Sequence, residues 1–251
     1  MLPPRTGLSN WAQTGSHSYS PAVTADLIRL TNVTKSYRIG DENICALADV
    51  SLTIASGDFV AIIGPSGSGK STLANVIGGL DRPDKGEVTV AGIQLAKASD
   101  REISAYRNSS IGFVFQAFNL QPHLTAHENV AVPLLLANMK RKDRQDRARD
   151  CLAEVGLSDR LKHLPSQLSG GQRQRVSIAR ALANQPKIII ADEPTGNLDS
   201  HRGAEIIELL RTLNGAGITL IVITHDAEVA DHASRQLVIH DGVVTERGAA
   251  A

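Results

Sequence analysis

Three short motifs in this chain bring together residue types that handle phosphate groups. Residues 64–71 read G-P-S-G-S-G-K-S and match the pattern G-x-x-x-x-G-K-[ST] of a phosphate-binding loop. Residues 168–172 read L-S-G-G-Q, and an apolar run from Ile188 ends in the carboxylates of Asp192 and Glu193. In this order, the three motifs predict a protein driven by ATP.

The glycine-rich loop is expected to bind the phosphates. Its glycines let backbone N–H groups approach phosphate oxygens, and the predicted helix behind it adds a positive N-terminal end. Lys70 is expected to reach the β- and γ-phosphates, and Ser71 to offer its hydroxyl to Mg²⁺. The residues of this motif expected to bind ATP are Gly64, Pro65, Ser66, Gly67, Ser68, Gly69, Lys70, Ser71 and Thr72.

The acidic pair ends a predicted buried strand, at the strand end where open α/β sheets bind ligands. We expect Asp192 to hold Mg²⁺ through water and Glu193 to act as general base on the attacking water. The alternative is that the two acids cap the turn at Pro194. His225 ends another predicted strand, where its imidazole could contact the γ-phosphate and the catalytic water.

Two further positions complete the predicted nucleotide site. Gln116 ends a predicted strand, and its neutral amide can ligate Mg²⁺ and report the γ-phosphate to the residues that follow. Tyr37 follows a β-type run, and its ring can stack on adenine, although a half-buried strand tyrosine is also common. The expected catalytic residues are Glu193, His225, Lys70 and Gln116. The expected metal ligands are Ser71, Gln116 and Asp192.

The segment Ser169, Gly170, Gly171 and Gln172 looks like a second phosphate cradle, with a hydroxyl, two glycines and a helix N-terminus. One chain needs only one such cradle for its own ATP, so a second would serve ATP held by another copy. Ser169 is also a plausible helix N-cap, and the two roles are compatible.

Strands and helices alternate along the chain, which predicts an α/β fold with a P-loop core and a mainly parallel sheet. An N-terminal antiparallel β subdomain and an inserted α-helical subdomain, about 117–172, complete this expectation. The expected strands are 27–30, 44–47, 50–54, 58–63, a pair over 87–95, 111–116, 187–192, 218–224, 236–240 and 242–246. The expected helices are 71–79, about 126–167, 172–183 and 200–213. The charged run 140–144 is expected on a solvated helix face.

Composition limits the possible classes of protein. The chain has 251 residues, is 42% hydrophobic and 21% charged, and has a formal net charge of +0. It therefore has no global field to attract nucleic acid, and no nucleic-acid partner is expected. No apolar run approaches the roughly 20 residues that span a bilayer. Residues 1–25 are expected to be a disordered tail, 26–246 a single ATPase domain and 247–251 a short tail.

On these residues, the chain resembles the ATP-binding subunit of an ABC transporter over 26–246. The resemblance implies an ATPase that forms a head-to-tail pair with a second copy or a paralogous ATPase, with two ATPs and Mg²⁺ between them. Asp199, after Gly196, Asn197 and Leu198, matches the loop that links the two sites. The family also implies membrane permease subunits as partners, and a place at the cytoplasmic face of the membrane.

Three segments are similar to the macrolide-exporter and lipoprotein-release branch: 79–81, 118–120 and 191–199. That branch implies export or mechanical coupling, with a lipoprotein, macrolide or peptide-type substrate. The alternatives are a cell-division-type signalling ATPase that moves no cargo, and a soluble ABC protein acting on DNA or ribosomes. The second is disfavoured because the chain has one cassette and no long coiled-coil insertion.

An apolar group near Gln116 is a candidate groove for a cytoplasmic helix of the permease. Its members are Phe115, Phe118, Leu120, Val130, Val132 and Leu134. The alternative is that they fill the core of the helical subdomain.

Overall fold

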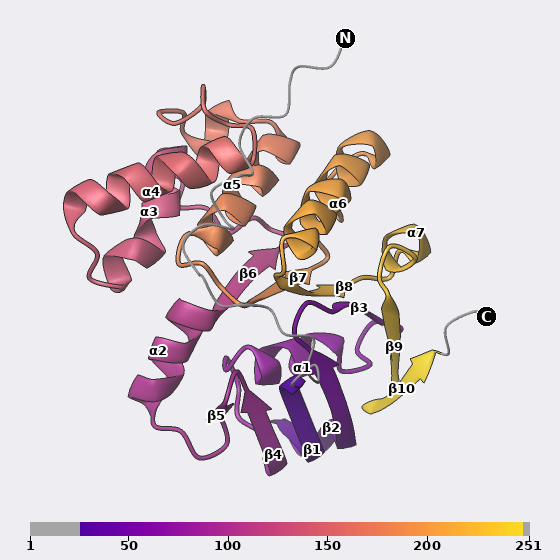
Figure 1. The fold of residues 1–251 in the computed structure, drawn as a ribbon. Coiled ribbons are helices and arrows are strands. Elements are labelled where there is room, and N and C mark those ends of the chain that lie inside the picture. The colour runs from indigo at the N-terminus through magenta and orange to yellow at the C-terminus, as the bar shows by residue number, and fades with distance from the viewer. Residues whose placement is uncertain (1–25, 248–251) are drawn as a thin grey trace, which may run out of the picture.

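The structure, a computed structural model, describes residues 26–247 (Figure 1). The segment 1–25, expected to be disordered, lies outside the described residues, as does 248–251 of the expected short tail. Within the described part, no helix is both long and apolar enough to cross a bilayer.

The central sheet has six strands in the order β10-β9-β3-β8-β7-β6. Its bounds are β3 Phe59–Ile63, β6 Ile111–Phe115, β7 Ile188–Asp192, β8 Thr219–Ile223, β9 Arg235–His240 and β10 Val243–Arg247. All neighbours pair in parallel except β10, which runs antiparallel to β9 at the edge. This confirms the predicted mainly parallel sheet. The apolar runs of β3, β7 and β8 follow from burial on both faces, which parallel sheets require.

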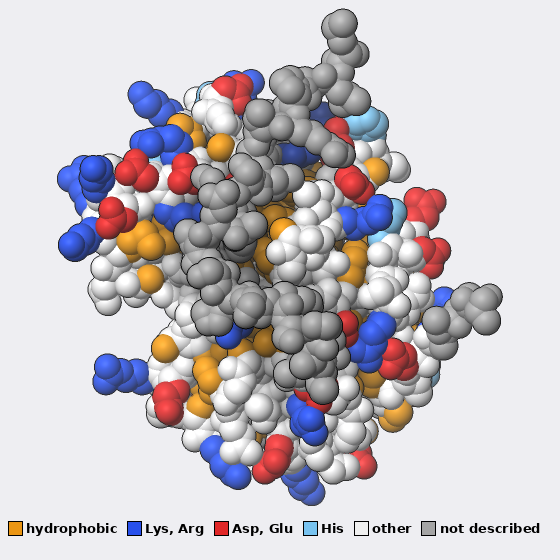
Figure 2. All heavy atoms as spheres, viewed as in Figure 1, with side chains coloured by type: hydrophobic (Ala, Val, Ile, Leu, Met, Phe, Trp, Pro, Cys, Tyr) orange, Lys and Arg blue, Asp and Glu red, His pale blue; other side chains and the backbone are white. Residues whose placement is uncertain are grey.

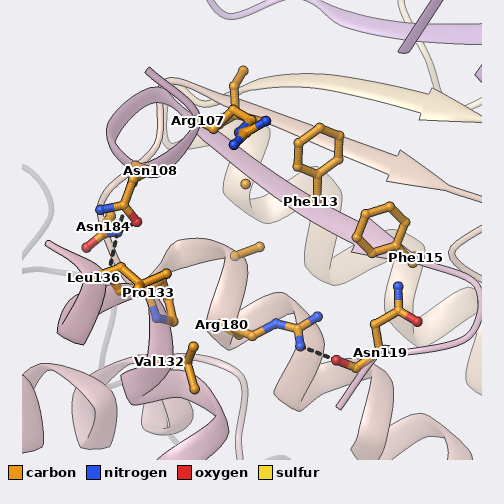
Figure 3. Close-up of a pocket in the computed structure, with 13 residues that line it drawn as sticks. Arg107, Asn108, Phe113, Phe115, Asn119, Val132, Pro133, Leu136, Arg180 and Asn184 are labelled. Atoms are coloured by element: carbon orange, nitrogen blue, oxygen red, sulfur yellow. Dashed lines mark hydrogen bonds between the residues drawn. The ribbon is translucent and has the colours of Figure 1, made fainter. Parts of the chain in front are cut away.

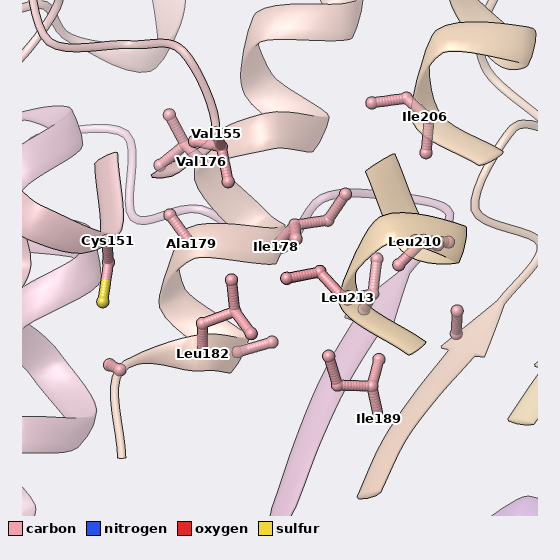
Figure 4. Packing of buried hydrophobic residues seen from close by; sticks show 14 of the residues in the cluster. Cys151, Val155, Val176, Ile178, Ala179, Leu182, Ile189, Ile206, Leu210 and Leu213 are labelled. Carbon is pink, nitrogen blue, oxygen red and sulfur yellow. The ribbon is translucent and has the colours of Figure 1, made fainter. Parts of the chain in front are cut away.

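Both faces of this sheet are buried, but in different cores. In β7, Ile188 and Ile190 face one cluster while Ile189 and Ala191 face the other, as the two-residue period of a strand dictates. The first cluster lies between the two sheets of the protein. The second lies on the opposite face of the sheet and includes Ile178 and Leu210 together with Ile189 (Figure 4).

The second sheet is antiparallel and has the order β2-β1-β4-β5. Its bounds are β1 Asp26–Ile39, β2 Glu42–Ala55, β4 Lys85–Val90 and β5 Ile93–Gln94. The prediction of separate short runs was wrong here, because β1 and β2 are continuous strands of 14 residues. Shifts in register interrupt their pattern, and Asn32 and Asp49 have positive φ within the strands. Because these bulges shift the alternation of buried and exposed residues, a two-residue period in the sequence does not indicate one long strand.

Helix α1 (Lys70–Ile77) packs between the two sheets, where Leu73 and Val76 join Ile62 and Val88 in the first cluster. Helix α2 (Asp100–Ser110) was not predicted. Its start carried a readable signal, because Ser99 and Glu102 form a reciprocal capping box. The four-residue helix α7 (Ala227–Ala230) was also missed.

The helical part consists of α3 (Ala126–Leu136), α4 (Arg141–Glu154), the short 3₁₀ turn η2 (Pro165–Gln167) and α5 (Gly170–Leu182). The predicted continuous helix over 126–167 was wrong. The backbone of Asn138 is left-handed and ends α3, and turns occupy 155–164.

The charged run 140–144 lies at the start of α4. Its first four residues are exposed, and Lys, Arg, Asp and Glu side chains mingle over the outer face of the helical part (Figure 2). The predicted solvated face is therefore correct. Helix α6 (Ser200–Gly215) covers the same side of the central sheet as α5 (Figure 1).

Candidate active site

The phosphate-binding motif forms the turn between β3 and α1. The backbone passes so close to neighbouring strands that a side chain would not fit: a Cβ on Gly64 would lie 2.1 Å from the carbonyl oxygen of Ile239, and one on Gly69 would lie 2.2 Å from that of Ala46. Lys70 begins α1, and its ammonium donates to the carbonyls of Gly64 at 2.9 Å and Pro65 at 2.7 Å. The lysine charge is thus held over the loop itself.

Two of the three metal-ligand candidates, Ser71 and Asp192, meet at this loop, and the third, Gln116, follows the neighbouring strand. Ser71 Oγ lies 3.5 Å from Asp192 Oδ2, although the two residues are far apart in the sequence. Phe115, which precedes Gln116, pairs with Asp192 in the register of β6 and β7. A hydroxyl, a carboxylate and an amide oxygen form the hard-oxygen donor set that suits Mg²⁺. The described residues contain no cluster of three His, Cys, Asp or Glu able to hold a metal without a substrate.

The acidity of Asp192 depends on its surroundings. Desolvation raises the pKa of its carboxyl, and the charge of Glu193 raises it further. A bound cation would oppose both effects by favouring the ionised form. Asp192 and Glu193 lie close together with like charges, so a bound divalent cation would stabilise their ionised forms.

Glu193 and His225 meet at the ends of β7 and β8. Nδ1 of His225 lies 2.7 Å from Oε1 of Glu193. The backbone of Glu193 is left-handed, with φ 47, which is uncommon for a non-glycine residue and is typical of functional sites. The hydrogen bond with Glu193, followed by its charge, raises the pKa of His225 above the ordinary value.

The structure agrees only in part with the alternative that Asp192 and Glu193 cap the turn at Pro194. A backbone turn does follow, since the N–H of Gly196 donates to the carbonyl of Glu193. The Glu193 carboxylate, however, binds His225 instead of that turn.

Gln116 follows β6 and faces the segment after the acidic pair. A Cβ on Gly196 would lie 2.7 Å from Nε2 of Gln116, so this side chain packs directly on the glycine. The side-chain amide of Asn197 donates to the backbone carbonyl of Gln116 at 2.7 Å. Asn197 was predicted only as part of the segment before Asp199, and no local pattern in the sequence indicates its contact with Gln116.

Tyr37 lies within β1, not after it, and is half-buried. Its hydroxyl donates to Asp81 at 2.6 Å and also hydrogen-bonds with the side chain of Thr72 in the first turn of α1. The structure therefore brings the predicted base-binding tyrosine to the phosphate-binding helix.

The segment 169–172 begins α5. Ser169 accepts a hydrogen bond from the N–H of Gln172 at 3.3 Å, and the Gln172 side chain accepts one from the N–H of Ser169 at 2.9 Å. The expected N-cap is therefore present as a full capping box.

Gly170 and Gly171 pack against the segment that contains Asp199. A Cβ on Gly170 would lie 3.2 Å from Leu198, and one on Gly171 would lie 3.5 Å from Arg202. Asp199 caps α6 by accepting from the N–H of Arg202 at 3.0 Å, and this bond lowers the pKa of Asp199. The glycine-rich helix start and the loop at Asp199 thus lie side by side within one chain.

The predicted apolar groove is present in altered form. A pocket between α2, β6, α3 and α5 is lined by Phe113, Phe115, Val132, Pro133 and Leu136 (Figure 3). Of the six predicted members, only Phe115 and Val132 line this pocket. Val130 and Leu134 are fully buried in the core under the helical part, Leu120 packs against that core, and Phe118 is not part of the pocket lining. Sequence reasoning also missed Arg180, whose guanidinium lines this pocket and donates to the carbonyls of Phe118 and Asn119.

A comparison with known families decides the classification. The ABC transporter family profile matches residues 47–196. The chain belongs to the ABC transporter family. It is an ATP-binding cassette domain, as its resemblance to that family implied.

Close relatives and solved structures agree with this assignment. The cassette is 50% identical over 224 residues to the uncharacterised ABC transporter ATP-binding protein YvrO of Bacillus subtilis, covering 88% of this chain and 98% of that protein. It is 50% identical over 220 residues to the macrolide export ATP-binding/permease protein MacB of Burkholderia pseudomallei. That match covers 88% of this chain but only 34% of MacB.

Two solved structures of MJ0796 share the fold. The dimeric structure of this bacterial ABC transporter cassette is 50% identical in sequence and has a TM-score of 0.82. The match covers 89% of this chain and 99% of the MJ0796 chain. The dimeric post-hydrolysis state, bound to ADP and phosphate, is 49% identical with the same TM-score.

Proposed function

We propose that this cassette is the ATP-hydrolysing subunit of an ABC transporter, which dimerises head to tail on ATP and drives separate membrane permease subunits. The observation that carries the proposal is the convergence of five side chains at one end of the central sheet. Lys70 and Ser71 begin the helix behind the phosphate-binding turn, Asp192 lies 3.5 Å from Ser71, and His225 holds Glu193 at 2.7 Å.

The phosphates would bind to the Lys70 ammonium and to the backbone N–H groups of residues 66–72 and Gly64, since Pro65 has none. Ser71, Gln116 and Asp192, the last through water, would hold Mg²⁺, which neutralises charge on the phosphate oxygens. Glu193 accepts a proton from the attacking water. The water oxygen then bonds to the γ-phosphorus as the bond to the ADP oxygen breaks, which releases ADP and inorganic phosphate.

His225 orients the base in this scheme. One of its ring nitrogens is taken by Glu193, so the other nitrogen can face the γ-phosphate. Its raised pKa favours the charged imidazolium, which suits contact with a phosphate.

A second copy of the chain would complete each site. Ser169 uses its oxygen as a helix cap, and its hydroxyl hydrogen stays available to a phosphate. The start of α5 adds its positive end to the same ligand. Because these groups adjoin the loop at Asp199, closure on a partner's ATP would also bring Asp199 to the dimer interface. The dimeric state of the two MJ0796 structures supports this arrangement.

The permease would dock in the pocket of Figure 3, which is lined by Phe115, the residue before Gln116. The apolar part of its lining and the exposed side chains of Leu135 and Leu136 suit the apolar face of an amphipathic cytoplasmic helix, and Arg107 and Arg180 suit its polar side. A cassette docked in this way would lie at the cytoplasmic face of the membrane. The similarity to MacB, a macrolide export protein, favours export. The resemblance of segments 79–81, 118–120 and 191–199 extends the candidates to mechanical coupling and to lipoprotein or peptide-type substrates.

The basic test is phosphate release by the purified chain with Mg²⁺ and ATP. We expect turnover that is lost in Lys70→Ala through weakened ATP binding. An equally folded Lys70→Arg variant is the matched control for charge, and we expect it to retain part of the ATP affinity. A chain that neither binds nor hydrolyses ATP, with or without added membranes, would refute the proposal.

A further inference from the structure

The surroundings of Tyr37 form a connected cluster beside the groups that bind phosphate. Asp81 follows α1 and is folded back along it, since the N–H groups of Leu80 and Asp81 both donate to the carbonyl of Asn75, at 2.8 and 3.2 Å. This turn brings the Asp81 carboxylate to β1. One of its oxygens accepts the hydroxyl of Tyr37 at 2.6 Å.

Lys35 closes the cluster from the same strand. Lys35 and Tyr37 are two residues apart on β1 and so lie on one face of the strand. The Lys35 ammonium lies 2.9 Å from the other oxygen of Asp81 and 5.2 Å from the centre of the Tyr37 ring. Its side chain is only 12% exposed, which makes this a shielded contact and not a surface ion pair.

The cluster connects Tyr37 to both ends of the phosphate-binding helix. At the start of α1, Thr72 hydrogen-bonds with the Tyr37 hydroxyl. Beyond the end of α1, Asp81 binds the same hydroxyl. The ring is therefore held against the element that carries Lys70 and Ser71.

We propose that Asp81, supported by Lys35, is a positioning residue for the nucleobase: it fixes the Tyr37 ring at a set distance from the phosphate-binding loop. The inference rests on the proposed nucleotide site. A ring that is already ordered costs less entropy when a base stacks on it. Loss of Asp81 should therefore weaken the binding of ligands that carry adenine and leave the binding of ligands that carry only phosphate unchanged.

The test compares Mg-ADP with Mg-pyrophosphate, which share two phosphates and differ in the adenosine. Calorimetric titration of the full chain should show ADP binding weakened roughly 2- to 10-fold in Asp81→Ala, the range expected for one freed side chain. Pyrophosphate affinity should stay unchanged. Asp81→Asn keeps an oxygen acceptor for Tyr37, so its ADP affinity should fall less than that of Asp81→Ala.

Two further variants separate positioning from folding. Tyr37→Phe removes the same hydrogen bond from the other partner while it keeps the ring, and should show the same selective loss. The double variant Tyr37→Phe/Asp81→Ala should then bind ADP only slightly more weakly than Tyr37→Phe, because the hydrogen bond is already absent. Asp84→Ala is the matched control: Asp84 contacts Lys35 at 3.4 Å but does not bind the Tyr37 hydroxyl. It should retain near-normal ADP affinity.

Three results would overturn the inference. They are an equal loss for ADP and pyrophosphate, no loss for ADP in Asp81→Ala and Tyr37→Phe, or fully additive losses in the double variant. If wild-type protein bound ADP and the Tyr37→Ala variant bound it equally tightly, the inference about Asp81 would fail. The proposed function would still stand. If the wild-type protein bound neither ligand, the proposed function itself would fail.

Discussion

Nδ1 of His225 lies 2.7 Å from Oε1 of Glu193, although 32 residues separate the two in the chain. The contact exists because β7 and β8 are parallel neighbours, with Asp192 opposite Ile223. Both strands then end at the same sheet edge. An acid that can accept a proton and an imidazole that can carry one are thus placed together next to the phosphate-binding turn.

Replacing Glu193 with Gln should stop the chemistry without stopping binding. Glutamine keeps the size of the side chain and a hydrogen-bonding oxygen but cannot accept a proton. Phosphate release should fall about 10²- to 10⁴-fold, the usual range for a lost general base. Mg-ATP should still bind and should trap a dimer, measurable by light scattering after gel filtration. Near-normal turnover would remove Glu193 from this role.

The His225–Glu193 pair should make stability depend on pH. Its hydrogen bond raises the pKa of His225 above 6.5 in the folded protein, so the imidazole binds a proton more tightly folded than unfolded. This stabilisation is fully present below the unfolded pKa and is lost as pH rises through the folded pKa. The melting temperature of wild type should exceed that of His225→Gln in mildly acidic buffer, and the difference should shrink at alkaline pH. A difference that stays constant with pH would contradict the pairing.

Asp192→Asn should stabilise the protein free of nucleotide while it abolishes Mg²⁺-supported turnover. Burial and the neighbouring Glu193 raise the pKa of Asp192, so ionising it at neutral pH costs the folded state free energy. Asparagine removes that charge and keeps an oxygen near Ser71. We expect a higher melting temperature at pH 7 than for wild type and a smaller gain in acid, where Asp192 is protonated. A lower melting temperature at neutral pH would show that the charge does not destabilise the apo fold.

Composite sites should make the specific activity rise with protein concentration while dimerisation is weak. A mixture of Lys70→Ala and Ser169→Arg proteins should recover activity, because each mixed dimer contains one intact site. The control is Ser99→Arg, which breaks the same kind of capping box at α2. It should lower stability by about 1 kcal/mol, as a lost cap does, and leave the concentration dependence intact. Specific activity that is unchanged down to monomeric protein would exclude a site built from two copies.

A charge in the proposed docking pocket should separate ATP hydrolysis from membrane recruitment. Leu136 is 70% exposed at the pocket, so Leu136→Asp should fold normally. In cells the variant should leave the membrane fraction, and after purification it should keep its basal ATP turnover. Leu80→Asp, at a leucine 47% exposed elsewhere, is the matched control and should stay with the membrane. Tight binding of purified wild type to lipid vesicles would argue instead for direct contact with lipid.

Much of the fold was predictable from the chain because the decisive patterns are local. The apolar runs before Gly64 and Asp192 each describe a strand buried on both faces, and the strand-loop-helix order around Lys70 needs only neighbouring residues. Where the pattern depends on irregular backbone, prediction failed. The bulges near Asn32 and Asp49 concealed two long strands, and the left-handed Asn138 divided a helix that looked continuous.

The sequence by itself determined which residue types were available for phosphate chemistry and at what local spacing, since these depend on strand and helix periods. Only the tertiary structure decided which of them meet. The strand order β3-β8-β7-β6 brings Ser71 to Asp192 and His225 to Glu193. The turn after α1 brings Asp81 to Tyr37, and packing buries Leu134 while it leaves Leu136 exposed. Such contacts depend on pairings between segments distant in the chain, and no local spacing encodes them.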